Sequence, residues 1–426
     1  MTDGNKNSTS RRQFIKSTST LAAAGAALGS SALTSPASGF HHSVRDTLHV
    51  GVVGCGGRGT HAATNALNGD ENCKITALAD IFPNRLEECV RSLNQQVPDR
   101  MELEGRTFSG WDCCEELLKT NVDVVILTTP PHFRPAQLKM CIDAGKHVFC
   151  EKPVGVDVPG VLDVMETCRQ AQEKGLSVVS GLCWRYDYGV REVMKRIQDG
   201  AIGEIKAIQE NYLTGLLWHR GNNPEWSQME TQMRNWLYYT WLSGDHIAEQ
   251  HIHSIDKALW LMNDEPPKTC YGTGGRLVRT DPKFGNVYDH FSCVFEWENG
   301  TKCFSHCRQM DANFTNVEDY VFGSKGTAEV LKHAINDEIV YEKRGKPSMY
   351  DVEHEFLFKG IRDGNPINNG TYMSYSTLMA IMGREAAYTG KRLNWDEFLQ
   401  DDLRLGPDTY EWGDYEPMPV ALPESD

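Results

Sequence analysis

The sequence predicts an α/β protein in which a doubly wound parallel sheet precedes an α+β domain with an open, mainly antiparallel sheet. Two observations lead to this prediction. From residue 46 to about 182, short apolar runs alternate with segments of helical pattern, as in successive βαβ units. Beyond about residue 200, apolar and polar residues alternate over several consecutive runs, which is typical of antiparallel strands.

The first half of the chain supplies the parallel sheet. Its expected strands are 48–53, 74–79, 122–128, 146–150 and 177–181. Its expected helices are 58–68, 83–95, 112–119, 133–144 and 157–173. The carboxyl ends of parallel strands share one edge, and ligands of such sheets bind there. We therefore expect the glycine-rich turn after residue 53 to meet two other turns at this edge, Thr128–Pro130 and Glu151–Pro153.

The second half supplies the α+β domain. Expected strands are 204–213, 268–279, 288–298, 301–309 and 314–323, and expected helices are 246–262, 350–363 and 371–389. The aromatic segment 214–243 reads as a loop region. These elements divide the chain into 1–45, a dinucleotide-type domain at 46–182, a second domain at 183–395, and a tail at 396–426. The acidic end of this tail, 408–426, is expected to lie along the surface.

Composition excludes several classes of protein. The net charge is −15, and no basic block follows the first residues, so nucleic acids and anionic membranes are not expected as main partners. No apolar run is long enough to span a bilayer. The chain has 13 cysteines, none in C-x-x-C spacing, and several lie in apolar runs. We expect buried free thiols rather than a disulfide or zinc framework.

The start of the chain is typical of a twin-arginine export signal. Arg11 and Arg12 precede a weakly apolar run at 21–28 that is too short to cross a membrane, and small residues follow it. The alternative is a disordered tail that happens to contain two arginines. We expect residues 1–45 to be a signal peptide and linker, and the protein to be periplasmic or otherwise exported.

A glycine fingerprint follows the first expected strand, in the run Gly54, Cys55, Gly56, Gly57, Arg58 and Gly59. Gly54 permits the tight turn, Gly56 lets the backbone approach a pyrophosphate, and Gly59 lets the helix pack closely on the strand. The helix N-terminus adds partial positive charge. Asp80 lies 21 residues after Gly59, where a carboxylate accepts hydrogen bonds from a ribose diol. This pattern predicts NAD, with NADP as an alternative.

A lysine follows the fourth long strand of the sheet. Strand 146–150 leads into Glu151, Lys152 and Pro153 at the expected ligand edge. A lysine at this place can hydrogen-bond a substrate hydroxyl and stabilise the alkoxide that develops as hydride leaves. The alternative is an ordinary surface lysine in a turn. We assign Thr129, Pro130, Glu151 and Lys152 to the cofactor site, together with Gly54, Gly56, Gly57, Arg58, Gly59 and Asp80.

The expected helix 246–262 carries a polar stripe. On one helix, Glu249 and His253 would lie four residues apart on the same face. A carboxylate beside an imidazole raises the pKa of the imidazole and fixes its orientation, which suits a general base. Two alternatives stay open: a metal held by His246, Glu249 and His253, and a purely structural polar helix. We assign no metal.

Three motifs together resemble the Gfo/Idh/MocA oxidoreductase family. They are the glycine loop, the segment 144–153 that contains Glu151-Lys152-Pro153, and the set Glu249, His253 and Asp256. The resemblance spans 48 to about 395, and 387–391 and 395–397 are also typical of the family. It implies that Lys152 is the catalytic lysine, His253 the catalytic histidine, and Glu249 the carboxylate four residues before it. The family more often has Asp at that carboxylate, and often His where this chain has Arg134.

The family resemblance also suggests where a substrate binds. Trp184, Arg185 and Tyr186 are similar to a substrate-facing segment of relatives. Aromatic side chains crowd the segment before the polar helix, and rings of this kind stack on sugar faces: Trp218, His219, Trp226, Trp236, Tyr238, Tyr239 and Trp241. The alternative is that half of these rings fill the core or an oligomer interface. We assign Lys152, Trp184, Arg185, Tyr186, Trp218, His219 and His253 to substrate binding.

These observations predict an NAD(H)-dependent oxidoreductase that acts on a sugar or polyol, as a homodimer or homotetramer. One alternative is an NAD-assisted glycoside hydrolase or lyase, in which transient oxidation of a ring carbon permits elimination with no net redox change. Another is a cofactor-bound sugar-binding protein without turnover. Export would favour a cofactor that is loaded early and held tightly, because no soluble pool of it exists outside the cytoplasm.

Overall fold

The N-terminal part of the chain forms a parallel sheet. The computed structural model describes residues 46–342 and 344–423, so the expected export signal with Arg11 and Arg12 lies outside the described residues. Within them, six strands pair in the order β3-β2-β1-β4-β5-β6, all parallel. They are β1 (Leu48–Val53), β2 (Cys73–Asp80), β3 (Thr107–Ser109), β4 (Val124–Leu127), β5 (His147–Cys150) and β6 (Val178–Ser180). Five of these strands were predicted; β3 is too short and too exposed to show a pattern.

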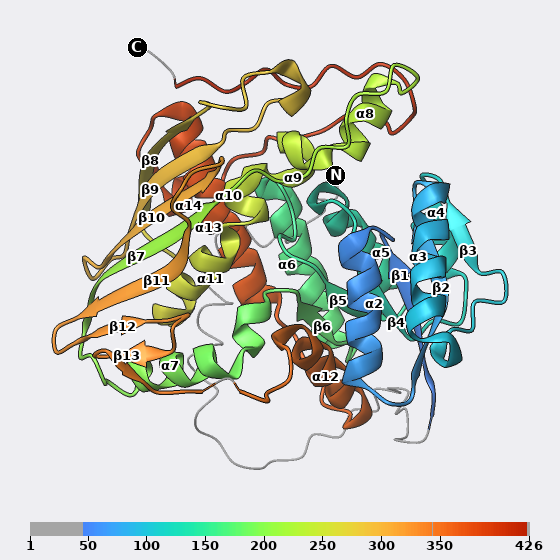
Figure 1. Ribbon diagram of the computed structural model, residues 1–426, viewed down its shortest axis with the longest axis horizontal. Helices are drawn as coiled ribbons and strands as arrows, with labels where there is room; N and C mark the ends of the chain where they lie inside the picture. The colour runs from blue at the N-terminus through green and yellow to red at the C-terminus, as the bar shows by residue number, and fades with distance from the viewer. Residues whose placement is uncertain (1–45, 343, 424–426) are drawn as a thin grey trace, which may run out of the picture. The chain divides into compact units, whose positions relative to one another are not determined.

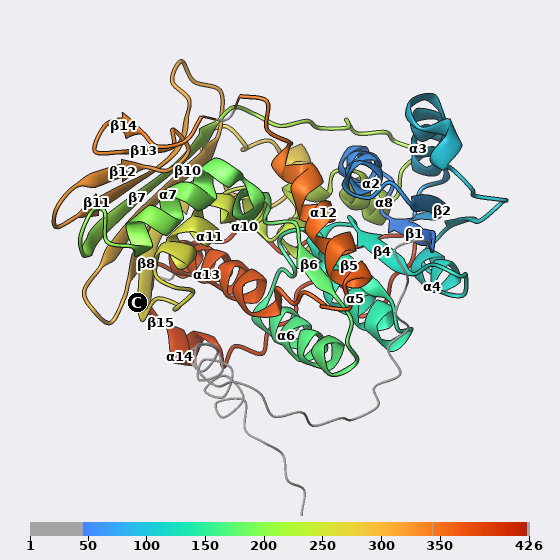
Figure 2. The ribbon, with the colours of Figure 1, turned by 90° about the horizontal axis from the view of Figure 1, so that it is seen from below.

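Helices cover both faces of this sheet, as Figure 2 shows. One face carries α2 (Gly57–Gly69), α3 (Pro83–Gln96) and α12 (Met349–Arg362), and the other carries α4 (Cys113–Leu118), α5 (Arg134–Asp143) and α6 (Val158–Glu173). Strand residues such as those of β4 are all buried, because apolar helix faces meet them from both sides. The predicted doubly wound sheet is confirmed.

One helix of this layer comes from far along the chain. The side chains of Val352, Leu357 and Phe358 on α12 are buried in the same core as β1 and β2. Gly69 lets α2 approach closely, since a Cβ there would lie 2.7 Å from the backbone nitrogen of Glu355. Helix α12, which falls within the predicted second domain 183–395, therefore packs on α2 of the first, and the two helices lie side by side in Figure 1.

The second sheet is open and mixed. In the described residues nine strands follow the order β14-β13-β12-β11-β7-β10-β9-β8-β15, and every pair is antiparallel except β7 with β10. They are β7 (Ile205–Thr214), β8 (Thr269–Gly275), β9 (His290–Glu296), β10 (Lys302–Gln309), β11 (Asn316–Gly323), β12 (Thr327–Glu329), β13 (Ala334–Ile335), β14 (Glu338–Ile339) and β15 (Leu393–Asn394). This confirms the predicted mainly antiparallel sheet.

The two faces of the second sheet differ. Strand β9 alternates between buried and half-buried residues, with Phe291, Cys293 and Phe295 buried. Helices α10 (Asp245–Glu249), α11 (Ile252–Leu261) and α13 (Gly370–Thr389) pack on this sheet, and α7 (Tyr188–Gln198) packs on α11. By contrast, the rings of Tyr271, Phe304 and Phe322 are exposed to solvent.

The predicted single helix over 246–262 is wrong. The chain forms α10, which ends at Glu249, and α11, which begins at Ile252. At the break, the amides of Gln250 and His251 both donate to the carbonyl of His246. The Gln250 side chain accepts a hydrogen bond from Gln309 at 2.6 Å. Contacts with the second sheet thus interrupt a segment whose local pattern is compatible with one helix.

Two more features complete the fold. The segment 214–243, predicted as a loop, contains α8 (Gln228–Arg234), a short turn of helix at Trp236–Tyr238 and α9 (Thr240–Ser243). After α14 (Trp395–Phe398), the chain runs to residue 423 without helix or strand.

All 13 cysteines are buried free thiols, as predicted. Among the described helices, none has the length and apolar character needed to cross a bilayer.

Candidate functional site

The glycine loop between β1 and α2 has the backbone that its motif predicts. Gly54 has φ +95°, and a Cβ there would lie 2.7 Å from the backbone of Thr128 and Thr129. A Cβ at Gly59 would lie 1.8 Å from the carbonyl oxygen of Gly54. In contrast, a Cβ at Gly56 or Gly57 would meet no atom within 4 Å, and no side chain caps α2. The loop therefore leaves open space at a helix N-terminus, which fits a pyrophosphate.

Asp80 ends β2 beside this loop. Its carboxylate accepts hydrogen bonds from the backbone amides of Cys55, at 2.7 Å, and Phe82, at 2.8 Å. Burial raises the pKa of Asp80, and these amides act in the opposite direction. Asp80 thus holds the glycine loop in place, and its oxygens have lone pairs left for a ribose diol.

Arg58, assigned to the cofactor site from the sequence, forms ion pairs with two buried carboxylates. Its guanidinium pairs with Glu151 and with Glu353, the latter at 2.9 Å. Burial acts to lower the pKa of Arg58, but the two carboxylates outweigh this effect and raise it. Arg58 thus forms a half-buried ion pair with the buried carboxylate of Glu151.

The turns after β4 and β5 are linked by one buried side chain. Arg134 donates to the carbonyl of Thr129 at 2.7 Å and to that of Pro153. It connects the turn of Thr129 and Pro130 to the turn of Lys152 and Pro153, whose peptide bond is cis. The sequence marks Arg134 only as a departure from the family pattern; its linking role depends on the fold.

Lys152 meets Glu249 at the carboxyl edge of β5. The ammonium donates to a carboxylate oxygen of Glu249 at 3.1 Å and to the Glu249 backbone carbonyl. Each side chain retains 15% of its surface exposed. Since Lys152 belongs to the first sheet and Glu249 to α10, this pair joins elements far apart in sequence. Both residues were expected at the site, and the structure brings them together.

His253 lies in the first turn of α11, beside these charges. Its Nδ1 is buried and has no hydrogen-bond partner within the described residues. Burial, and then the positive charge of Lys152, lower the pKa of His253 well below its usual value. Both effects favour the neutral form of the ring. Glu249 does not orient it as predicted, because α10 ends at Glu249 and the carboxylate binds Lys152 instead.

A buried ion pair fixes the start of α11. Lys257 donates to the backbone carbonyl of His253 at 2.7 Å and pairs with Asp319 of β11 at 3.0 Å. Neither charged side chain is exposed. The Lys257 ammonium also lies 5.3 Å from the centre of the Trp184 ring. Lys257 thereby contacts both His253 and Trp184, a residue that was expected to bind the substrate.

Polar groups continue between α11 and the second sheet. His251 contacts the Ser305 hydroxyl at 2.6 Å, and that hydroxyl donates to Glu210 at 2.9 Å. Burial, reinforced by Asp319, raises the pKa of Glu210 to about 8. The hydrogen-bonded set of His251, Ser305 and Glu210 was not predicted from the sequence. A signal was present, because Glu210 and Asp319 each lie two residues from a buried apolar residue on the same strand, Ile208 and Val321.

Arg185 and Tyr186, predicted to face the substrate, have structural contacts instead. Arg185 pairs with Asp256 at 2.9 Å and Asp264 at 2.7 Å, and its guanidinium lies 3.8 Å from the centre of the Tyr372 ring. The Tyr186 hydroxyl donates to Asn369 at 2.8 Å. Both side chains are buried by these contacts.

The aromatic segment before α10 is divided between core and surface. Tyr238, Tyr239 and Trp241 are buried in a core cluster, as the alternative interpretation expects. Trp218 is 37% exposed and packs on Trp236, and His219 contacts the carbonyl of Lys283 at 2.9 Å. Their contacts therefore connect Trp218 and His219 to neighbouring loops rather than to Lys152 or His253.

His246 does not converge with Glu249 and His253. Its Nδ1 faces Asp245 at 3.1 Å and its Nε2 faces the Cys307 thiol at 3.4 Å. In the described part of the chain, no three His, Cys, Asp or Glu side chains are arranged to hold a metal ion.

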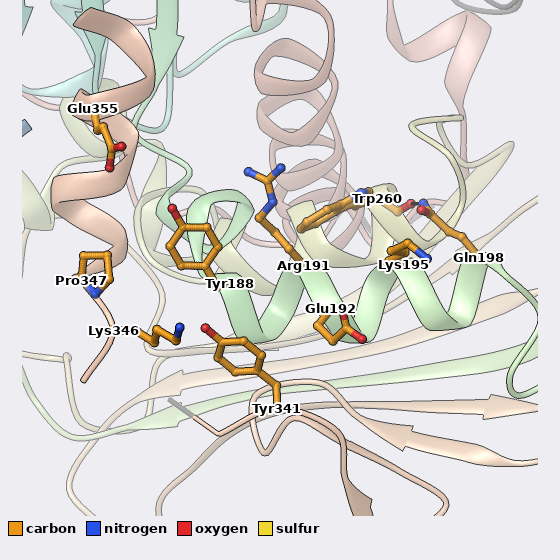
Figure 3. A pocket seen from close by; sticks show the side chains of 10 residues that line it. All are labelled: Tyr188, Arg191, Glu192, Lys195, Gln198, Trp260, Tyr341, Lys346, Pro347 and Glu355. Atoms are coloured by element: carbon orange, nitrogen blue, oxygen red, sulfur yellow. Dashed lines mark hydrogen bonds between the residues drawn. The ribbon is translucent and has the colours of Figure 1, made fainter. Parts of the chain in front are cut away.

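A separate cavity of about 830 Å³ opens along α7 (Figure 3). Aromatic and charged side chains from four segments line it, and none of them belongs to the cluster of Lys152, Glu249 and His253: Tyr188, Arg191, Glu192, Lys195, Gln198, Trp260, Tyr341, Lys346, Pro347 and Glu355. We therefore place the candidate active site at the Lys152 cluster and not in this cavity.

Comparison with known families matches both parts of the chain. Residues 48–180 match the model of the oxidoreductase family with an NAD-binding Rossmann fold, and residues 190–329 match the GFO/IDH/MocA C-terminal domain. The first match covers the glycine loop, Asp80 and Lys152. The N-terminal domain is therefore an NAD-binding domain, which agrees with the open space at Gly56 and Gly57.

Similar curated proteins carry out different reactions. The chain is 28% identical to 2,7-anhydro-N-acetylneuraminate hydratase of Escherichia coli (strain K12), over 66% of this chain and 67% of that protein. It is 25% identical to inositol 2-dehydrogenase of Rhizobium meliloti (strain 1021), over 66% of this chain and 74% of that protein.

Solved structures share the fold. One is scyllo-inositol dehydrogenase from Lactobacillus casei with bound cofactor NAD(H) and scyllo-inositol, with TM-score 0.64 and 20% identity, over 82% of this chain and 100% of that one. Another is aldose-aldose oxidoreductase from Caulobacter crescentus, with TM-score 0.65 and 19% identity, over 82% of this chain and 99% of that one.

Proposed function

Because this chain belongs to the Gfo/Idh/MocA family of oxidoreductases, we propose that it is an NAD(H)-dependent enzyme acting on a carbinol carbon of a sugar or polyol. One observation carries this proposal. The Lys152 ammonium, held by Glu249, lies beside a neutral His253 at the edge of the sheet that binds the dinucleotide. In this arrangement Lys152 is a cation that can bind an oxygen, and His253 is a group that can accept a proton.

Three groups of residues have separate tasks in this mechanism. The backbone at Gly56 and Gly57 would hold the pyrophosphate of NAD and Asp80 would hold its ribose, and the bound cofactor would supply a hydride acceptor at its nicotinamide ring. An ammonium carries three N–H donors, and two of those on Lys152 are directed at Glu249. The third is left to hydrogen-bond the substrate oxygen and to stabilise negative charge as it develops there.

His253 completes the proposed chemistry as the general base. A neutral imidazole accepts the proton of the carbinol while Lys152 binds the oxygen. Lys257 keeps the His253 backbone at the start of α11, and Trp184 forms an apolar surface beside it. Glu249 acts on Lys152, where it orients the ammonium, rather than on the histidine.

A second candidate is a redox-neutral reaction at the same residues, such as hydration or elimination on a glycoside. The observation that favours it is the hydratase among the similar curated proteins. Removal of a proton by His253 and stabilisation of an adjacent oxyanion by Lys152 serve such chemistry as well.

One experiment separates these candidates. The purified protein is incubated without added nucleotide with inositols, aldoses, aryl glycosides and 2,7-anhydro-N-acetylneuraminate, while reduced nicotinamide and products are measured. Stoichiometric reduction of bound cofactor supports the dehydrogenase, whereas product without net reduction supports the second candidate. Binding without either result would leave a cofactor-bound sugar-binding protein. Lys152→Ala should abolish turnover, and Lys139→Ala, an exposed lysine of α5, serves as the matched control.

We also propose that the protein is exported to the periplasm with its cofactor already bound. The support is the Arg11–Arg12 pair followed by the weakly apolar run 21–28. Cell fractionation tests this proposal: replacing both arginines by lysine should retain the protein in the cytoplasm, and unchanged export would contradict it.

A homo-oligomer is proposed on different grounds. The exposed rings of Tyr271, Phe304 and Phe322 lie on three strands of the second sheet, and open sheets of this kind are commonly covered by a second copy. Light scattering should report a dimer or tetramer that Phe304→Glu weakens. A monomeric wild-type protein would contradict this proposal.

A further inference from the structure

The C-terminal strap, residues 404–421, crosses the carboxyl edge of the first sheet. Its first part is fixed to α6: Arg404 pairs with Asp163 at 2.8 Å, and the Leu405 amide donates to Asp157 at 2.9 Å. Gly406 follows with φ +101°, and a Cβ there would lie 2.7 Å from the His132 ring. The chain therefore turns closely past the residues that follow β4.

The middle of the strap places two aromatic rings on this edge. The Trp412 ring lies 5.6 Å from the Phe82 ring and 4.8 Å from the Trp111 ring, measured between centres. The Tyr410 hydroxyl lies 2.7 Å from Nε2 of His132. Phe82, Trp111 and His132 follow β2, β3 and β4 respectively. The two rings thus lie over the ends of β3, β2 and β4, on both sides of the end of β1.

The last part of the strap is held by its backbone. The carbonyl of Gly413 accepts from the Met229 amide at 3.0 Å, the Tyr415 carbonyl accepts from Gln232 at 2.5 Å, and the Tyr288 hydroxyl donates to the Ala421 carbonyl at 2.8 Å. The segment that carries the rings of Tyr410 and Trp412 is therefore held by hydrogen bonds on both sides.

The covered edge is where the adenosine end of the cofactor belongs. In this type of sheet the residue that ends β2 binds the adenosine ribose, and here that residue is Asp80, two positions before Phe82. Although Trp412 packs on Phe82 and Trp111, it retains 44% of its surface exposed. In addition, the indole Nε1 of Trp111 is buried with no hydrogen-bond partner within the described residues. An aromatic surface and an unsatisfied donor therefore lie beside the ribose-binding carboxylate.

We propose that the C-terminal strap forms the outer wall of the adenosine subsite, with Trp412 stacking on the adenine, and that it slows the release of NAD. This inference rests on the NAD binding of the proposed function and deepens it, because it gives a structural basis for a cofactor that stays bound through many turnovers. It does not depend on which sugar is the substrate.

Nucleotide binding to the full chain tests the proposal. Apo-protein, Trp412→Ala and a chain ending at Leu403 are loaded with NAD⁺, ADP-ribose or nicotinamide mononucleotide, and dissociation is followed by rapid filtration. Leu422→Ala, whose side chain is 79% exposed on the same tail, is the matched control. We expect Trp412→Ala to raise the NAD⁺ dissociation rate constant about tenfold, as expected for loss of one aromatic stack on a base. ADP-ribose should show the same change.

The affinity for nicotinamide mononucleotide, which lacks adenosine, should not change. Unchanged NAD⁺ release in both Trp412→Ala and the shortened chain would overturn the proposal. Slower release after removal of the strap would also overturn it, because the strap would then compete for the subsite. Equal weakening of the binding of NAD⁺, ADP-ribose and nicotinamide mononucleotide would also overturn the proposal. None of these measurements involves a sugar, so an error in the proposed reaction cannot be mistaken for an error in this inference.

Discussion

Lys152 is positioned by contacts to the backbone beside it and to its ammonium. Arg134 ties the neighbouring Pro153 carbonyl to the turn after β4, and Glu249 binds the ammonium. The backbone and the charge are therefore both fixed before any substrate arrives. Such preorganisation is what allows one ammonium to stabilise a developing alkoxide effectively.

Replacing Lys152 by Met tests this role. We expect kcat to fall by about 10²–10⁴-fold, because the cation that stabilises the developing charge is lost. The dissociation constant of NAD⁺ should change little, since the pyrophosphate and ribose contacts lie at Gly56, Gly57 and Asp80. Single-turnover kinetics and calorimetry measure the two quantities. Parallel losses in both would indicate a structural role instead.

The pH dependence of the reaction tests His253. Burial and the charge of Lys152 hold its pKa well below its usual value of about 6.5, so the proton-accepting form persists as the pH falls below that value. The profile of kcat/KM should therefore show no His253-dependent loss near pH 6.5, and any acid limb should lie lower. A half-loss near pH 6.5 that disappears in His253→Asn would contradict this assignment.

At the scale of elements, α11 is held against the second sheet by the buried pair of Lys257 and Asp319. Removing one member of such a pair leaves an uncompensated charge in the interior. Lys257→Met should lower the free energy of unfolding by about 3–5 kcal/mol. Denaturant unfolding measures this effect.

Two further variants make the test of this ion pair specific. Lys195→Met removes an exposed lysine of α7 and should cause no measurable change. The double variant Lys257→Met/Asp319→Leu should recover much of the lost stability, because neither charge is then left alone. A double variant as unstable as Lys257→Met alone would show that the cost comes from packing rather than charge.

The elements also show which parts of the fold local pattern can predict. Strands with continuous apolar runs and helices with clear periodicity were predicted to within a few residues. The break between α10 and α11 was not predicted, because it involves a contact of Gln250 with Gln309, 59 residues away. The same limit applies to the site: Lys152 and His253 are marked by motifs, whereas the roles of Arg134 and Lys257 arise only from long-range contacts.

At the scale of the whole molecule, the candidate site combines groups from distant parts of the chain. Gly56, Asp80 and Lys152 lie at or just after the ends of strands of the first sheet, while Glu249 and His253 come from helices that pack on the second. Arg185, which the family resemblance assigns to the substrate, pairs with Asp256 and Asp264 in the assembled fold. A motif thus locates a residue on an element, but the assembled fold decides whether its side chain is available.

A crystal structure of the protein with NAD⁺ is the most direct test of this assembly. We expect the pyrophosphate against the amides of Gly56 and Gly57, the adenosine ribose at Asp80, and the nicotinamide ring beside Lys152 and His253. A nicotinamide ring placed away from both residues, with well-defined density elsewhere, would contradict the assignment of the active site.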